Sequence, residues 1–237
     1  MNNHFVYSKK ISLTPNQRID DTLKIEADSD FIIEKVYASY DNSFKINIID
    51  TSSNYNWFSD RIRAENWFGT PQYPNELTKS IEILRNTLLK IDIENLVNTP
   101  NNIEIAFEGY RIYDIPITIG KTRYFAYVKD LTINALDLIS DNILTNADSD
   151  FIIQRLIAYK DQDYALELKL SASNLGGRRL NNEFCNIDNI FGSVLRPNIL
   201  KHPLTIEKNS LIQFDVRNLL NSIINAQIVF DGVKVWR

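Results

Sequence analysis

The residues with the clearest capacity for chemistry in this chain are aspartates in a repeated heptapeptide. Residues 27–33 read Ala-Asp-Ser-Asp-Phe-Ile-Ile, and the same seven residues recur at 147–153. Carboxylates two residues apart can converge on one calcium ion, so a calcium site is the first hypothesis to weigh. Each copy supplies one such pair: Asp28 with Asp30, and Asp148 with Asp150.

Turn formation accounts for the heptapeptide better than metal binding does. The pattern lacks the additional oxygen ligands and the glycine of a calcium loop. Asp and Ser immediately before a strand favour a turn, because their side chains hydrogen-bond to the nearby backbone. A glycosidase needs two carboxylates on opposite sides of a sugar, and neighbouring turn positions place them poorly. We therefore interpret both copies as turns, and we predict no metal and no cofactor.

The remaining candidates for catalysis are too few to form a reaction centre. His4 and His202 are the only histidines and lie at unrelated positions, so a metal triad or a Ser-His-Asp arrangement lacks its usual residues. Cys185 is the only cysteine, which excludes an intramolecular disulfide and a thiolate cluster. We predict that the chain has no catalytic residues and is not an enzyme.

A glycine-rich segment in the second half resembles a phosphate-binding loop only in part. Residues 176–179 read Gly-Gly-Arg-Arg, but no Lys-Ser or Lys-Thr follows and no helix is indicated. We interpret the segment as an exposed loop, in which Arg178 and Arg179 are candidates for contact with an acidic partner.

Aromatic and arginine residues gather in residues 51–66 and just beyond, where the two halves of the chain differ most. Such side chains can pack in a core, stack on sugar rings or anchor a protein interface. Arg mixed with Trp and Tyr is common at protein interfaces, so between the two surface roles we favour protein contact over sugar binding. The candidate interface residues are Tyr55, Trp57, Phe58, Arg61, Arg63 and Trp67.

Charge and hydropathy restrict the partners. The net charge is −4 and no basic run is present, so nucleic acid is not expected as a partner. The beginning of the chain lacks the charged start and apolar core of a signal peptide. No run of apolar residues approaches the length of a membrane span. We expect a soluble chain without a membrane partner.

The match between the halves extends well beyond the heptapeptide and predicts an internal duplication. Apolar positions from residue 5 onward recur 120 residues later, and the offset becomes 123 after residue 66. We predict two domains, residues 1–115 and 116–237, joined by a short apolar segment, Ile115 to Gly120. With the first offset, Phe44, Ile46 and Ile48 match Tyr164, Leu166 and Leu168.

Alternating apolar and polar residues predict about eight strands in each half, with a turn every 8 to 12 residues or so and no helical period. Eight strands favour two tandem jelly-roll-like antiparallel β-sandwich domains, an all-β fold. A glycine interrupts the last strand at a matched position of each half, Gly109 and Gly232, which indicates a bulge or a close backbone approach.

The order of these residues resembles a known class of proteins. Ala-Asp-Ser-Asp-Phe, then Phe-Gly-Thr with prolines, then Asn-Ile-Glu-Ile-Ala-Phe-Glu-Gly-Tyr is similar to β-sandwich modules in structural proteins of tailed bacteriophages. The doubled module is most similar to virion proteins of crAss-like phages, such as capsid accessory or portal-adjacent ring proteins.

The resemblance implies a non-enzymatic virion protein, made in the host cytoplasm. It implies a homo-oligomeric ring at the portal and head–tail junction, in contact with portal, capsid or tail components and with copies of itself. Two alternatives stay open: a capsid accessory protein, and a carbohydrate-binding module of a phage tail or host protein.

Overall fold

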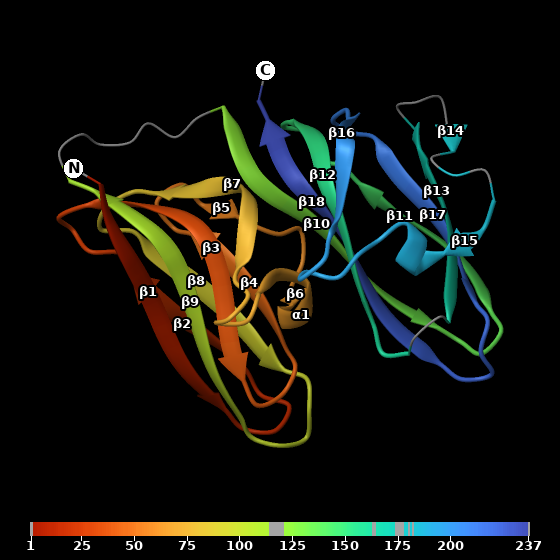
Figure 1. Cartoon of the computed structure of the whole chain (residues 1–237), viewed down its shortest axis with the longest axis horizontal. Helices are drawn as coiled ribbons and strands as arrows, with labels where there is room; N and C mark the ends of the chain where they lie inside the picture. The colour runs from red at the N-terminus through yellow and green to blue at the C-terminus, as the bar shows by residue number, and fades with distance from the viewer. Residues whose placement is uncertain are drawn as a thin grey trace. The chain divides into compact units, whose positions relative to one another are not determined.

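The computed structural model describes residues 2–113, 121–162, 165–173, 178–179, 181 and 183–236. The chain divides into two compact units, Met1–Phe125 and Ala126–Arg237. The predicted linker, Ile115 to Gly120, lies outside the described residues. Both units are built almost entirely of antiparallel strands (Figure 1), which confirms the prediction of an all-β sandwich-type fold.

The first unit contains two antiparallel sheets. One has the order β1-β9-β3-β7, and the other has the order β2-β8-β4-β5, with β6 also paired to β4. The bounds are β1 Asn2–Leu13, β2 Arg18–Lys24, β3 Asp30–Tyr40, β4 Phe44–Asp50, β5 Tyr55–Asn56, β6 Ile62–Arg63, β7 Asn75–Ile83, β8 Leu88–Asn95 and β9 Asn101–Ile112.

The second unit repeats this strand order, beginning with β10, whose first residues belong to the first unit. One sheet is β10-β18-β12-β16, and the other is β11-β17-β13-β14, with β15 also paired to β13. The bounds are β10 Thr122–Ile133, β11 Leu138–Leu144, β12 Asp150–Lys160, β13 Leu166–Ala172, β14 Arg178–Arg179, β15 Cys185–Asn186, β16 Asn198–Ile206, β17 Leu211–Asn218 and β18 Ile224–Val235.

These orders are those of a jelly roll. If β5 and β6 are counted as one position, and β14 and β15 as another, the described strands give eight positions in each unit. Successive positions alternate between the two sheets, except that β4 and β5–β6 share a sheet, as do β13 and β14–β15. Helical structure in the described part of the chain is short and includes α1, Ala64–Trp67, and a 3-10 turn at Ile187–Asn189. No helix in these ranges has the length and apolar character needed to cross a membrane.

Alternation along the strands determines which side chains form the core. In β4, Phe44, Ile46 and Ile48 are fully buried, while the residues between them are half-buried on the other face of the sheet. Strand β13 has the same pattern. Successive side chains of a strand point to opposite faces, so one apolar row from each sheet fills the interior of the sandwich.

The pairing of β13 corrects one detail of the predicted match between the halves. Phe44 pairs with Asn95 in the first unit, and Leu166 pairs with Asn218 in the second. The residues of the second unit that correspond to Phe44, Ile46 and Ile48 are therefore Leu166, Leu168 and Leu170. The predicted match of Ile46 and Ile48 to Leu166 and Leu168 was wrong by two residues, and Tyr164, the predicted match of Phe44, lies outside the described residues. The segment of chain between β12 and β13 is two residues longer than the segment between β3 and β4.

Candidate functional site

The predicted aromatic surface lies in the core of the first unit. Trp57, Phe58 and Trp67 are all buried. The ring centroids of Trp57 and Trp67 are 5.8 Å apart, those of Phe58 and Trp67 are 4.9 Å apart, and Trp57 contacts the central Phe107 at 6.0 Å. The interface expectation is therefore corrected for these three residues, because a ring buried in the sandwich can neither stack on a sugar nor anchor a partner.

Backbone pairing explains this burial. Strands β5 and β6 both add to β4, through Ile49 opposite Asn56 and Ile46 opposite Ile62. The backbone amide of Trp57 also donates to the carbonyl of Ile48 at 3.1 Å. The segment thus closes one side of the sandwich instead of extending from it as a loop.

The two arginines of the segment are half-buried and engaged. Arg61 forms an ion pair with Glu94 at 2.8 Å, and Arg63 donates to the hydroxyl of Ser43 at 3.4 Å. Both partners belong to the first unit, so the described contacts of these arginines hold the sheet and its neighbouring turns together.

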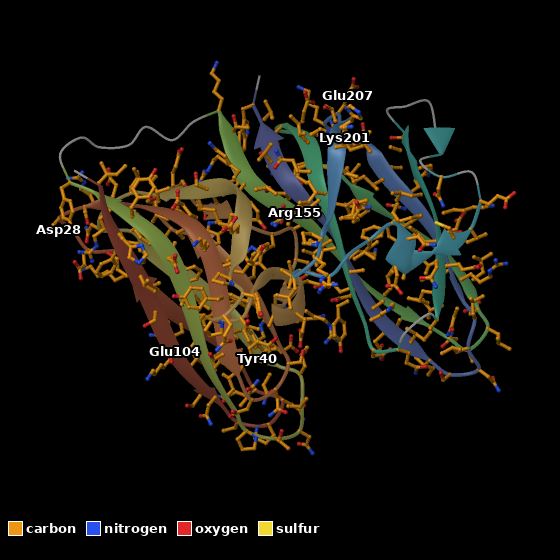
Figure 2. The ribbon with its side chains drawn as sticks, viewed as in Figure 1. Asp28, Tyr40, Glu104, Arg155, Lys201 and Glu207 are labelled. Atoms are coloured by element: carbon orange, nitrogen blue, oxygen red, sulfur yellow. The ribbon has the colours of Figure 1, made fainter. Side chains whose placement is uncertain are left out.

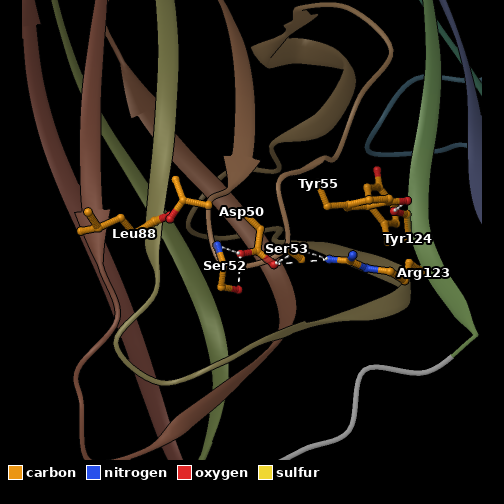
Figure 3. A network of polar contacts seen from close by, with 8 residues as sticks. Asp50, Ser52, Ser53, Tyr55, Leu88, Arg123 and Tyr124 are labelled. Atoms are coloured by element: carbon orange, nitrogen blue, oxygen red, sulfur yellow. Dashed lines mark hydrogen bonds and ion pairs between the residues drawn. The ribbon is translucent and has the colours of Figure 1, made fainter.

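Tyr55 belongs to a polar network centred on the buried carboxylate of Asp50 (Figure 3). Asp50 accepts hydrogen bonds from the hydroxyls of Ser52 and Ser53 at 2.7 and 2.6 Å, and from Arg123 at 3.3 Å. The Arg123 guanidinium lies 3.7 Å from the centre of the Tyr55 ring. The Tyr55 hydroxyl in turn donates to the carbonyl of Tyr124 at 3.1 Å.

This network is suited to fixing the chain rather than to chemistry. The carboxylate is neutralised by an arginine and surrounded by donors, which is how a buried charge is stabilised. Within the described residues, no group of three or more His, Cys, Asp or Glu is placed to hold a metal ion.

Arg178 and Arg179 are placed by their backbone alone. They form β14, which pairs with β13 through Ser171 opposite Arg179 and Ala172 opposite Arg178. Their side chains lie outside the described part of the molecule. Their possible role in contact with an acidic partner stays a prediction.

The repeated aspartates form the turns that the sequence predicted. Asp30 accepts from the backbone amide of Arg85 at 2.7 Å, and Asp150 accepts from that of Lys208 at 3.1 Å. Each bond joins the first residue of β3 or β12 to the turn before β8 or β17. Asp28, labelled in Figure 2, accepts from the adjacent Ser29 hydroxyl at 2.9 Å.

Tyr127 is hydrogen-bonded to the loop before β12 in the second unit. Its hydroxyl accepts from the backbone amide of Asn146 at 2.7 Å and donates to the Asn146 side chain at 3.2 Å. Burial, with a further contribution from the charge of Asp148, raises the pKa of Tyr127 to about 12. The folded state therefore holds this proton more tightly than the unfolded chain, in which a tyrosine titrates near 10.

We expect Tyr127→Phe to reduce the loss of stability at alkaline pH. A raised pKa stabilises the folded state fully below pH 10 or so, and this contribution is lost as the pH rises towards 12 or so. Urea unfolding at several pH values in this window measures the effect. The free energy of unfolding should fall less steeply with pH for the variant than for the parent protein. Tyr73→Phe, at a side chain that is 71% exposed, is the control. Equal slopes for Tyr127→Phe and the parent would contradict this account.

An exposed apolar cluster at one end of the second unit was not predicted. The tip patch consists of two residues on or beside the turn before β11 and two on the loop after β17. The turns are joined by hydrogen bonds from the Leu136 amide to the Leu220 carbonyl and from the Asn218 amide to the Asp137 carbonyl, both 2.9 Å. The patch residues and their exposed fractions are Leu136 67%, Leu138 53%, Leu219 43% and Ile223 56%.

A polar hollow on the outer face of the second unit was also missed. It has a volume of about 250 Å³ and lies over the strands β11, β17 and β13. Its members are separated by up to 75 residues along the chain, and only strand pairing brings them together. The side chains on this face are Ser140, Asn142, Lys169, Ser171, Gln213 and Asp215.

Comparisons with known proteins add little to these observations. No protein-family model matches the chain, and no curated protein matches it. Among solved structures, the protein YhaK from Escherichia coli is matched at 6% sequence identity and a TM-score of 0.21, over 97% of this chain and 86% of YhaK. A likeness this weak carries no argument about fold or function.

Proposed function

We propose that the chain is a non-enzymatic structural protein of a tailed-phage virion, which assembles through the tip patch into a ring at the portal and head–tail junction. The resemblance of both halves to phage β-sandwich modules supports the class. The tip patch is the single observation that carries the assembly role. Four large aliphatic side chains exposed on adjacent loops form the kind of surface that protein contacts cover.

The backbone at Leu136 strengthens the argument. Leu136 has φ 56°, in the left-handed region that disfavours branched side chains, whereas the corresponding Asn16 of the first unit has φ 52°. Asparagine tolerates this conformation, and leucine adopts it at a cost of roughly 1 kcal/mol. The second unit therefore accepts both strain and an exposed leucine at a position where asparagine would serve the fold better. Such a combination is typical of a residue retained for contact.

The proposed occupant of the patch is another copy of this chain. The corresponding turns of the first unit carry Asn16 and Arg18, so the patch belongs to one unit only. A contact between this patch and a different surface of the next copy is heterologous. Heterologous contacts form a ring when the rotation between copies closes, and an open filament when it does not. A capsid accessory role, the alternative, would place a different structural protein on the same surface.

Exchange of the patch for the residues of the first unit tests the proposal. We expect Leu136→Asn with Leu138→Arg to weaken self-association at least tenfold, because apolar contact area is lost and a charge is introduced. We expect the free energy of unfolding to stay level or to rise by about 1 kcal/mol, since the strain at residue 136 is relieved. Light scattering across a concentration series, together with urea unfolding, measures both effects.

Leu144→Lys is the matched control. Leu144 is an exposed leucine at the other end of β11, and the first unit has Lys24 at the corresponding position. This variant should assemble like the parent protein. A parent chain that is monomeric at every concentration, or a patch variant that assembles normally, would contradict the proposal. A monomer that binds a capsid or tail protein through the patch would support the accessory role instead.

A further inference from the structure

We propose that the hollow on the outer face of β11, β17 and β13 is a binding site for a neutral carbohydrate. This ligand is separate from any protein partner and does not depend on the tip patch. The site is distinct from the tryptophan platform considered from sequence, whose rings are buried in the other unit.

Two cross-strand rows of polar residues form the floor of the hollow. Asp215 of β17 lies opposite Ser140 of β11 on one side and Lys169 of β13 on the other. Two residues earlier in β17, Gln213 lies between Asn142 and Ser171 in the same way. Three neighbouring strands span about 10 Å across the rows, so the floor is wide enough for more than one polar group of a ligand to bind at once.

Several of these groups have hydrogen-bonding capacity to spare. Ser140 donates to Asp215 at 2.6 Å. Among the described residues, no hydrogen bond engages the side-chain amides of Asn142 and Gln213 or the hydroxyl of Ser171. Amides and hydroxyls both donate and accept, and this mixture matches the hydroxyls of a sugar, which also do both.

The charges around the hollow offset one another, which favours an uncharged ligand. Lys169 lies across from Asp215. Arg217 and Glu167, on the next row, form an ion pair. On this face the described side chains therefore present two cations and two carboxylates, which is not the arrangement that selects phosphate, sulfate or a divalent cation.

An aromatic ring borders the polar floor. Phe184 is half-buried, and the charged groups of Lys169 and Arg217 both lie 4.6 Å from its ring centre. These two side chains hold the ring at the edge of the sheet.

The corresponding sheet of the first unit lacks a comparable polar floor, because long paired side chains lie across it. Arg18 donates to both carboxylate oxygens of Asp92 at 2.7 Å, and Lys90 pairs with Asp20 at 3.1 Å. The second unit has Leu138 and Gln213 in place of Arg18 and Lys90. The loss of these two ion pairs leaves the short side chains of the second unit open to a ligand.

Binding of defined oligosaccharides to the full chain tests the site. The probes are neutral hexasaccharides of glucose, galactose, mannose and N-acetylglucosamine, with a heparin hexasaccharide as the charged comparison. We expect at least one neutral probe to bind with a Kd in the micromolar to millimolar range, measured by titration calorimetry. Asn142→Ala with Gln213→Ala should weaken that binding by about tenfold or more, since two hydrogen-bonding groups are removed.

Thr22→Ala with Lys90→Ala provides the matched control, because these residues hold the corresponding positions in the first unit. This variant should bind like the parent protein. Both double variants alter residues on the outer face, and a thermal unfolding curve for each confirms that the fold is retained. The proposal is overturned if no neutral probe binds, if only the heparin fragment binds, or if binding survives the loss of both amides.

Discussion

Trp57→Ala is expected to destabilise the first unit by about 3–5 kcal/mol, the range for removing a large aromatic side chain from a core. The Trp57 ring is fully buried and packs against Trp67 and Phe107. Its indole N–H has no hydrogen-bond partner among the described residues. The alanine variant therefore loses packing and leaves a cavity, and removal of the unpaired N–H offsets only part of this loss.

Urea unfolding followed by hydrogen exchange and mass spectrometry can assign this loss to one unit. Peptides of the first unit should gain exchange at lower urea, because a loss of this size is a large fraction of the stability of a small domain. Tyr73→Ala, at an exposed ring in the same unit, should change the unfolding free energy by less than about 0.5 kcal/mol. If Trp57→Ala were as stable as the Tyr73 variant, the described core would be incorrect.

The strands were predictable because their side-chain alternation is strong and local. Phe44, Ile46 and Ile48, which alternate with polar or less buried positions in the sequence, lie on β4, and Gly109 lies within β9, the last strand of the first unit, as predicted. The role of the repeated aspartates was also predictable. Asp30 and Asp150 were interpreted as residues that hydrogen-bond to nearby backbone, and each accepts a hydrogen bond from a backbone amide.

Register between the halves was harder to predict, for a simple physical reason. A shift of two residues along a strand leaves every apolar side chain on the same face, so the alternating pattern of β13 fits two alignments equally well. Only the partner strand decides between them, through Leu166 opposite Asn218. Hydrophobic pattern therefore determined the face of this strand and left its register open.

The burial of Trp57 and Trp67 was hidden for a different reason. Residues 51–66 have no regular period, and strands β5 and β6 contain two residues each. Segments this short give no alternation to detect, so the aromatic residues appeared to lie in a loop. Their place in the core depends on pairing with β4, which the local sequence does not encode.

The two surface features depend still more on tertiary structure. The hollow combines residues from three strands, and the tip patch combines two loops that are distant in sequence. One local signal did exist: the first unit has Asn16 at the turn position where the second has Leu136. A difference at one matched turn position becomes informative only when the backbone there is known to be left-handed.

Gly109→Ala and Gly232→Ala are each expected to destabilise their own unit by at least about 3 kcal/mol, beyond the usual cost of overpacking. A Cβ at Gly109 would lie 1.8 Å from the carbonyl oxygen of Ile32, and one at Gly232 would lie 1.9 Å from that of Ile152. Both atoms belong to the backbone of a paired central strand, so neither can move aside as a flexible side chain can.

A bulge at the same position of each unit, in β3 and in β12, accompanies the close approach of the backbone to Gly109 and to Gly232. Opposite Gly109, the pairing of β3 skips from Ile33 to Lys35, and the extra residue turns the neighbouring carbonyl towards β9. Glu108→Ala, at the adjacent position of β9, is the matched control. It removes only a partly exposed ion pair with Lys35 and should cost no more than about 1 kcal/mol. Hydrogen exchange should show the loss in the first unit for Gly109→Ala and in the second for Gly232→Ala. A Gly109 variant as stable as the Glu108 variant would show that the strands separate at the bulge at little cost, and the glycine would then need another explanation.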